Sequence, residues 1–124
     1  MKPFISRLPI LLAALALAGA ALADDGVVKS GDGVLQNSAG MTLYTFDKDV
    51  AGSGKSACTG PCAVAWPPLA APARVTAPYS IVTRDDGARQ LAYNGKPLYL
   101  FAADKAPGQR GGDNVKQIWH VAKE

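Results

Sequence analysis

The sequence predicts a small all-β domain built from two related halves. Three observations support this class. A ten-residue segment occurs twice, short apolar-polar runs are separated by turn-forming residues, and no stretch has a long helical periodicity. We therefore expect two pseudo-symmetric β-hairpin or meander repeats that share one core, arranged as a pair of sheets or a partly open barrel.

The internal repeat is the strongest pattern in the chain. Residues 40–49, GMTLYTFDKD, align with residues 95–104, GKPLYLFAAD, at an offset of 55. Glycine, leucine, tyrosine, phenylalanine and the last aspartate match in register, and a tryptophan follows each copy. Two copies are fewer than the roughly three that a solenoid needs, so the copies are expected to share one domain. The two repeats cover about residues 33–69 and 80–122.

Turn-forming residues separate the predicted strands. Asn94-Gly95 is the preferred pair for a type I′ turn, because both positions need positive φ, and it predicts a hairpin. Pro97 has no amide hydrogen, so it belongs at a position where the ladder needs no donor. The predicted strands are residues 33–36, 41–46, 80–84, 89–93, 96–101 and 117–121, with a short helical turn near 62–66. The stretches predicted to be irregular are 47–60 and 103–114, and residues 66–78 are expected to form a proline- and alanine-rich connection between the halves.

Residues 1–23 have the three parts of a cleavable secretory signal. Two basic residues precede an apolar run at residues 10–18, and small residues at the cleavage point precede Asp24. The run is shorter than the ~20 apolar residues that span a bilayer, so no stable membrane span is expected after cleavage. Residues 24–124 are then expected to form a single periplasmic or secreted β-rich domain.

The charge of the exported part gives no indication of a strongly charged partner. The chain has 13 basic and 10 acidic residues, and two of the basic residues belong to the signal, which leaves a net charge near +1. Without a cluster of lysine or arginine, neither nucleic acid nor an anionic membrane is indicated. The expected partner is an unidentified envelope protein or a small ligand.

Cys58 and Cys62 are the only cysteines in the chain. An even count in an exported protein favours a disulfide, and Gly60-Pro61 supplies the tight turn that so small a ring needs. A loop this short gains little chain entropy, so the bond is expected to shape a loop rather than hold the fold together. The alternative is a redox pair or metal ligand, but the spacing is C-x-x-x-C rather than the C-x-x-C of thioredoxin-like sites.

The repeated aromatic residues have two interpretations. Tyr44 and Phe46 alternate along one strand, as do Tyr99 and Phe101 along the other, so each pair shares a face. They form either a symmetric core in which each tyrosine hydroxyl finds a partner, or an aromatic platform in a ligand groove. A domain this small needs large side chains inside, which favours the core.

Asp49 and Asp104 follow the repeated strands where the chain turns. We expect each carboxylate to cap a loop by accepting backbone N–H bonds, and a pair of acids or metal ligands is the alternative.

His120 is the only histidine, so a site made of histidines alone is excluded within one chain, while a mixed site with aspartate or Met41 stays open. No cofactor, metal or catalytic residue is predicted, since no serine or cysteine lies in a nucleophile-elbow pattern.

The combination of these patterns resembles a known family. Tyr-x-Phe-x-x-Asp occurs at residues 44–49 and 99–104, with Cys58-x-Gly60-x-Cys62 and Trp66-Pro67-Pro68-Leu69 between them. Together they resemble the bacterial predicted lipoproteins with a conserved Yx(FWY)xxD motif, also called the secreted repeat of unknown function. The resemblance covers residues 33–121 and implies an exported, envelope-associated protein, but no activity. Many relatives are lipoproteins, whereas no lipobox cysteine follows this signal, so a lipid anchor is not implied.

The sequence therefore predicts an exported envelope protein of unknown activity, most simply a non-enzymatic binding or interaction module. The candidate binding residues are Tyr44, Phe46, Asp49, Trp66, Tyr99, Phe101, Asp104, Trp119 and His120. The alternative is a periplasmic redox or metal-handling protein that uses Cys58 and Cys62.

Overall fold

The computed structural model describes residues 26–124, and the predicted signal, residues 1–23, lies outside this range. The regular elements are almost all short strands, so the predicted all-β class is confirmed. In chain order they are β1 (Val28–Lys29), β2 (Leu35–Gln36), β3 (Tyr44–Phe46), α2 (Pro61–Ala65), β4 (Tyr79–Thr83), β5 (Arg89–Tyr93), β6 (Lys96–Pro97), the 3-10 helix η2 (Val115–Gln117) and β7 (Trp119–Val121). The helix α2 corresponds to the helical turn that was predicted near residues 62–66.

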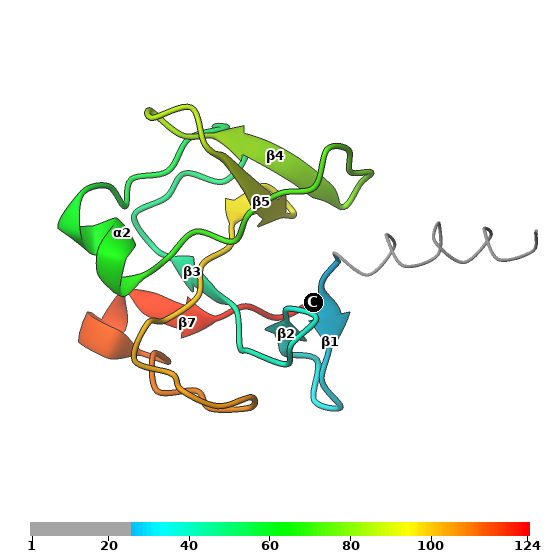
Figure 1. Ribbon diagram of the computed structural model, residues 1–124, viewed down its shortest axis with the longest axis vertical. Coiled ribbons are helices and arrows are strands. Elements are labelled where there is room, and N and C mark those ends of the chain that lie inside the picture. Colours follow the sequence, from blue (N-terminus) through cyan, green and yellow to red (C-terminus); the bar gives the residue numbers. More distant parts are fainter. Residues whose placement is uncertain (1–25) are drawn as a thin grey trace, which may run out of the picture.

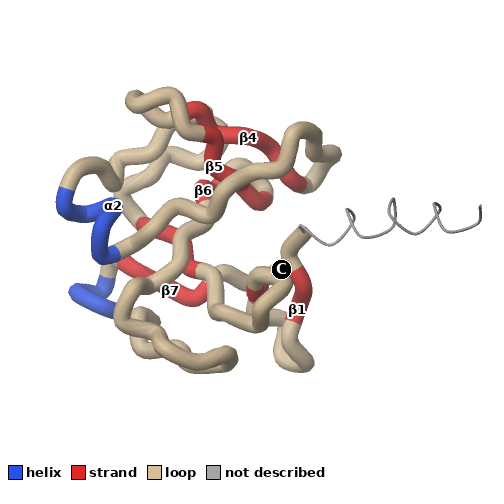
Figure 2. Tube along the Cα trace, viewed as in Figure 1, coloured by secondary structure: helices blue, strands red, loops and turns tan. Residues whose placement is uncertain are grey.

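The strands form three small antiparallel sheets, β1–β2, β3–β7 and β4–β5–β6 (Figure 2). In Figure 1 the β4–β5 hairpin lies in the upper half of the molecule, β3 lies near the middle, and β7 and the β1–β2 hairpin lie in the lower half. Isolated bridges connect the three sheets, and no sheet of the described residues closes into a barrel. The strands are two to five residues long, so they cannot build the two extended layers of a sandwich.

The two repeats meet at a central pair of tyrosines. Tyr44 and Tyr99 form an antiparallel bridge and exchange backbone hydrogen bonds, with N···O distances of 2.8 and 2.9 Å. Next to this bridge, Leu43 N donates to Leu35 O at 3.0 Å, and the corresponding bond of the second repeat has the same length. The halves are therefore related by an approximate two-fold axis at the tyrosine bridge, as the sequence repeat predicted.

The final segment of each repeat crosses over to the other repeat. The strand β7, which ends repeat two, pairs with β3 of repeat one. The equivalent segment of repeat one, residues 66–70, pairs with repeat two, where Leu69 N donates to Leu98 O at 3.0 Å and Ala70 bridges Gln90. This pairing was not predicted from the proline- and alanine-rich composition of residues 66–78. The prolines remove donors there, but the neighbouring amides and carbonyls still pair.

The hairpin predicted at Asn94-Gly95 is confirmed. Both residues have positive φ, 51° and 81°, as a type I′ turn requires, and they join β5 to β6. The strand β1 was not predicted, because two residues are too few to show a period. It pairs with β2 and so gives repeat one a hairpin that corresponds to β4–β5.

The core contains a stack of four aromatic rings. The ring centroids of Phe101 and Trp66 lie 4.2 Å apart, those of Trp66 and Trp119 lie 3.8 Å apart, and those of Trp119 and Phe46 lie 4.2 Å apart. The two motif tyrosines pack edge-on against the tryptophans, and both are completely buried. Leucines from both repeats form a second, aliphatic cluster. The repeated aromatic residues thus build a symmetric core.

We predict that Gly112→Ala destabilises this core. A Cβ atom at Gly112 would lie 2.7 Å from the Trp66 ring and 3.0 Å from the Tyr44 ring, closer than packed atoms allow. Overpacking of this kind costs about 1–3 kcal/mol, and each kcal/mol lowers the melting temperature by about 4–8 °C in a domain of this size. Thermal unfolding followed by circular dichroism measures the effect. Gly31→Ala is the control, because nothing lies within 4 Å of its Cβ position. Equal melting temperatures for the two variants would contradict the packing argument.

Candidate functional site

Each motif aspartate bonds to the motif tyrosine of the opposite repeat. Tyr44 OH donates to Asp104 Oδ2 at 2.5 Å, and Tyr99 OH donates to Asp49 Oδ2 at 2.6 Å. The other oxygen of each carboxylate accepts a backbone N–H from the loop that follows it, at 3.0 and 2.6 Å respectively. The aspartates therefore cap loops, as expected from the sequence, and they also join the two repeats.

The surroundings of these pairs keep the tyrosines protonated. Burial raises the pKa of the hydroxyls of Tyr44 and Tyr99, and the neighbouring carboxylates raise it further. Burial also raises the pKa of Asp49, against the opposing effects of the Tyr99 hydroxyl, the Ala57 amide and the positive charge of Arg84. Both tyrosine hydroxyls therefore stay protonated at neutral pH and donate to the carboxylates.

Cys58 and Cys62 form the predicted disulfide, with an S–S distance of 2.04 Å. Cys58 is completely buried against the aromatic core, and Cys62 packs at its edge. The three residues between them project as a small loop that leads into α2. The disulfide therefore fixes the shape of this loop, here called the disulfide loop, next to the core.

A groove with a volume of about 540 Å³ separates the disulfide loop from the turn between β4 and β5. Thr59 and Gly60 of the disulfide loop form one wall. The remaining lining includes the small apolar residues Ala63, Pro68, Ala70 and Ala88 and the charged residues Arg84, Asp85, Asp86 and Arg89. Its volume lies in the range of small-molecule binding sites, and its lining combines small apolar residues with charged ones.

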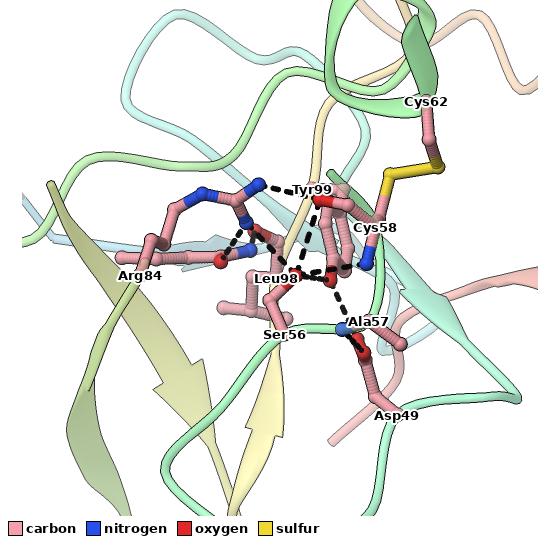
Figure 3. Close-up of a disulfide and its surroundings, with 9 residues drawn as sticks. Asp49, Ser56, Ala57, Cys58, Cys62, Arg84, Leu98 and Tyr99 are labelled. Carbon is pink, nitrogen blue, oxygen red and sulfur yellow. Dashed lines mark hydrogen bonds between the residues drawn. A yellow bond between two sulfur atoms is a disulfide. The ribbon is translucent and has the colours of Figure 1, made fainter. Parts of the chain in front are cut away.

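The buried side chain of Arg84 connects the two walls of the groove (Figure 3). Its Nη1 donates to Ser56 Oγ and to Gln90 Oε1, both at 2.8 Å, and its Nη2 donates to the backbone oxygen of Cys58 at 2.5 Å. Ser56 Oγ in turn lies 2.6 Å from Tyr99 OH. A continuous set of hydrogen bonds therefore runs from the core to the groove.

The sequence analysis missed Arg84, Ser56 and Gln90. None of them belongs to the repeated motif, and an arginine at the end of a predicted strand, next to a turn, is usually exposed. Comparing the two hairpin turns would have given a signal, because Arg84 occupies the place that Ser30 has in repeat one. Each donates its backbone amide to the carbonyl four residues later, at 2.8 Å for Arg84 and 2.9 Å for Ser30.

The remaining predicted residue lies away from the groove. His120 on β7 is partly exposed, and its Nε2 lies 2.9 Å from Asp47 Oδ2. This pair lines a second hollow of about 320 Å³. Within residues 26–124 no three side chains of histidine, cysteine, aspartate or glutamate come together to hold a metal ion. The sequence-predicted candidates thus fall in the core, in the disulfide loop and at this surface pair.

These features define a small, disulfide-containing β protein made of two interlocked repeats. A family model described as "Secreted repeat of unknown function" matches residues 26–70 and 80–123. The chain belongs to this family, whose description fits an exported protein of unknown activity. Neither the curated proteins nor the solved structures contain a match. No helix within residues 26–124 is long and apolar enough to cross a membrane.

We predict that Tyr99→Phe lowers the free energy of unfolding by about 1–3 kcal/mol, because it removes the hydroxyl that donates to Asp49 Oδ2 and one of the hydrogen-bond partners of Ser56 Oγ. Tyr44→Phe should have a loss of similar size, since it removes the equivalent bond to Asp104. Urea unfolding measures both. Tyr93→Phe is the matched control, because no hydrogen bond of the Tyr93 hydroxyl is found among the described residues, and it should leave the midpoint unchanged. A loss in the control as large as in the motif variants would overturn the assignment.

We also predict a pH-dependent difference between the wild type and Asp49→Asn. The pKa of Asp49 is raised above its ordinary value of 3.8, so the folded state binds this proton more readily than the unfolded chain. The free energy of unfolding of the wild type therefore falls, relative to the variant, as the pH rises from about 3.8 through the raised pKa. Above that window the difference becomes constant. Urea titrations at stepped pH measure the difference, and the absence of any slope would contradict the burial of this carboxylate.

Proposed function

We propose that this exported protein is a non-enzymatic binding module, periplasmic or secreted, whose small ligand lies in the groove between the disulfide loop and the β4–β5 turn. The observation that carries the proposal is an asymmetry between the two halves. Their cores are equivalent, but the groove exists at one hairpin turn, whereas the other hairpin turn is bonded to the loop beside it.

The β1–β2 turn is joined to the neighbouring loop by an ion pair. Arg110 donates to both oxygens of Asp32, at 2.8 and 3.0 Å. At the β4–β5 turn, Asp85 and Asp86 are exposed and form no ion pair within the described residues, and the space beside them is the groove. The two repeats share a core, and they differ in the turns and loops at its edge. A binding role is expected in those turns and loops, since loops on a rigid scaffold usually carry function.

The walls of the groove are held in place before any ligand arrives. The disulfide constrains one wall, and Arg84 bonds to that wall and to Gln90 on β5. Asp49 fixes the preceding loop through the amide of Ala57. A preformed site loses little conformational entropy on binding, which favours affinity for a small ligand. In this proposal the repeated motif supports the site, while the groove residues contact the ligand.

Burial argues against the alternative of a redox protein. A thiol–disulfide exchange partner must reach a sulfur atom along the S–S axis; Cys58 has no exposed surface, and Cys62 is partly buried at the edge of the aromatic core. The groove lies instead against the backbone of the disulfide loop, at Thr59 and Gly60. This arrangement favours a structural disulfide that shapes a binding wall.

Native mass spectrometry of the protein recovered after export from its own envelope tests the proposal. We expect the wild type to retain the added mass of a small molecule. Ala88→Trp should abolish the added mass, because Ala88 is an exposed turn residue that lines the groove and a large ring there would fill it. Ala106→Trp, an exposed position away from the groove, should retain it. A bare mass for the wild type, or equal retention by Ala88→Trp, would overturn the proposal.

A further inference from the structure

We infer that the ligand of this groove carries a carboxylate group and that Arg84 binds it. The inference rests on the proposed binding function of the groove and adds the chemical class of the ligand. Its basis is a buried guanidinium that lines the groove, together with a comparison of this site with the same place in the other half of the molecule.

Arg84 is buried without an ion-pair partner. Only 8% of its surface is exposed, and its hydrogen bonds go to a hydroxyl, an amide oxygen and a backbone carbonyl, all neutral. No carboxylate of residues 26–124 forms an ion pair with it. A buried charge is costly unless an opposite charge compensates it, so this site favours an anion from outside the chain.

The acidic residues around Arg84 do not take this role. Asp49 lies on the core side, where its Oδ2 accepts from Tyr99 OH and reaches Arg84 only through the Tyr99 and Ser56 hydroxyls (Figure 3). Asp85 and Asp86 are exposed at the rim of the groove, and Asp86 Oδ1 accepts the amide of Ala88. Asp49 thus offsets the charge of Arg84 in part from the interior, and neither carboxylate at the rim of the groove forms an ion pair with Arg84.

The guanidinium also has unused donors. Nε–H and the second hydrogen of Nη2 have no acceptor within the described residues. In that part of the chain, Thr42 Oγ1 is the single completely buried side-chain polar atom without a partner, so Nε is not completely buried. Nε and Nη2 share one edge of the planar guanidinium, and such an edge matches the two oxygens of a carboxylate.

The other half of the molecule shows what completes such a site. There the arginine, Arg110, comes from the loop and the serine, Ser30, from the turn, and both bond to the carboxylate of Asp32. In the groove the two residue types have exchanged places, with Arg84 on the turn and Ser56 on the loop. The arginine–serine pair is present in both halves, but the turn carboxylate bonds to it in only one. Asp86 occupies the place of Asp32, yet it accepts the amide of Ala88 and forms no ion pair with Arg84. The ligand is inferred to supply the missing carboxylate.

Nuclear magnetic resonance of the 15N-labelled protein recovered after export tests this inference, because the Arg84 Nε–H signal can be followed directly. The first probe is sodium acetate, compared with sodium chloride at the same ionic strength. We expect acetate, and not chloride, to shift the Nε–H signal together with the amide signals of Thr59, Gly60 and Ala88. The second probe is trialanine, compared with trialanine amide, whose carboxylate is blocked. Trialanine should bind about tenfold or more tightly than the amide.

Three variants assign the effect to Arg84. Arg84→Gln should reduce the affinity for trialanine to that for the amide. Arg84→Lys keeps the buried positive charge but loses the pair of donors that can bind both carboxylate oxygens. Its affinity for trialanine should therefore fall between those of the wild type and Arg84→Gln. Arg110→Gln is the matched control, because that arginine is already bonded to Asp32, and it should leave trialanine binding unchanged.

The outcomes separate this inference from the proposed function. An Arg84 Nε–H signal that responds to neither acetate nor trialanine overturns the carboxylate inference, and so does equal binding of trialanine and its amide. If a ligand is nevertheless retained in native mass spectrometry and lost in Ala88→Trp, the groove binds a ligand of another class. If no ligand is retained and no groove signal moves with any probe, the proposed function fails as well.

Discussion

Two reciprocal hydrogen bonds between tyrosine and aspartate fix the relation of the two repeats, and the rest of the structure depends on them. Each bond joins a hydroxyl of one repeat to a carboxylate of the other, in a buried environment where an unpaired partner would be costly. The final segment of each repeat pairs with the other repeat, and this exchange also holds the two repeats together. Neither half can complete its hydrogen bonds alone, so the chain folds as one interlocked unit.

The symmetric core uses most of the large side chains and leaves the rims free to differ. The tryptophan pair and Phe46 are buried in the stack, and Phe101 is partly buried against Trp66, so the stack serves the core. At one rim, Arg110 and Asp32 join the turn to the loop. At the other rim the arginine points inward from the turn, and an open groove remains. A binding role is therefore argued from the residues in which the repeats differ.

The same reasoning explains why membership of the family of secreted repeats implies a fold and no ligand. In this chain the tyrosines, phenylalanines and aspartates of the motif form the core and hold the bases of the loops. Groups that could recognise a ligand lie outside the motif, on the disulfide loop and the β4–β5 turn. The disulfide is small, yet it links the two regions, since Cys58 packs in the core and its carbonyl accepts from Arg84.

The sequence by itself determined the all-β class, the two-fold repeat, the type I′ turn at Asn94-Gly95 and the disulfide. Each of these follows from residues close together in the chain or from a direct internal comparison. Only the tertiary structure decided that Tyr44 bonds to Asp104, 60 residues away, and that residues 66–70 pair with the other repeat. It also decided that Arg84 is buried, because burial depends on which distant segments pack over a side chain. Local sequence patterns determine the turns and which side chains share a face of a strand. Hydrogen-bond partners across the two-fold axis depend instead on how the two repeats pack together.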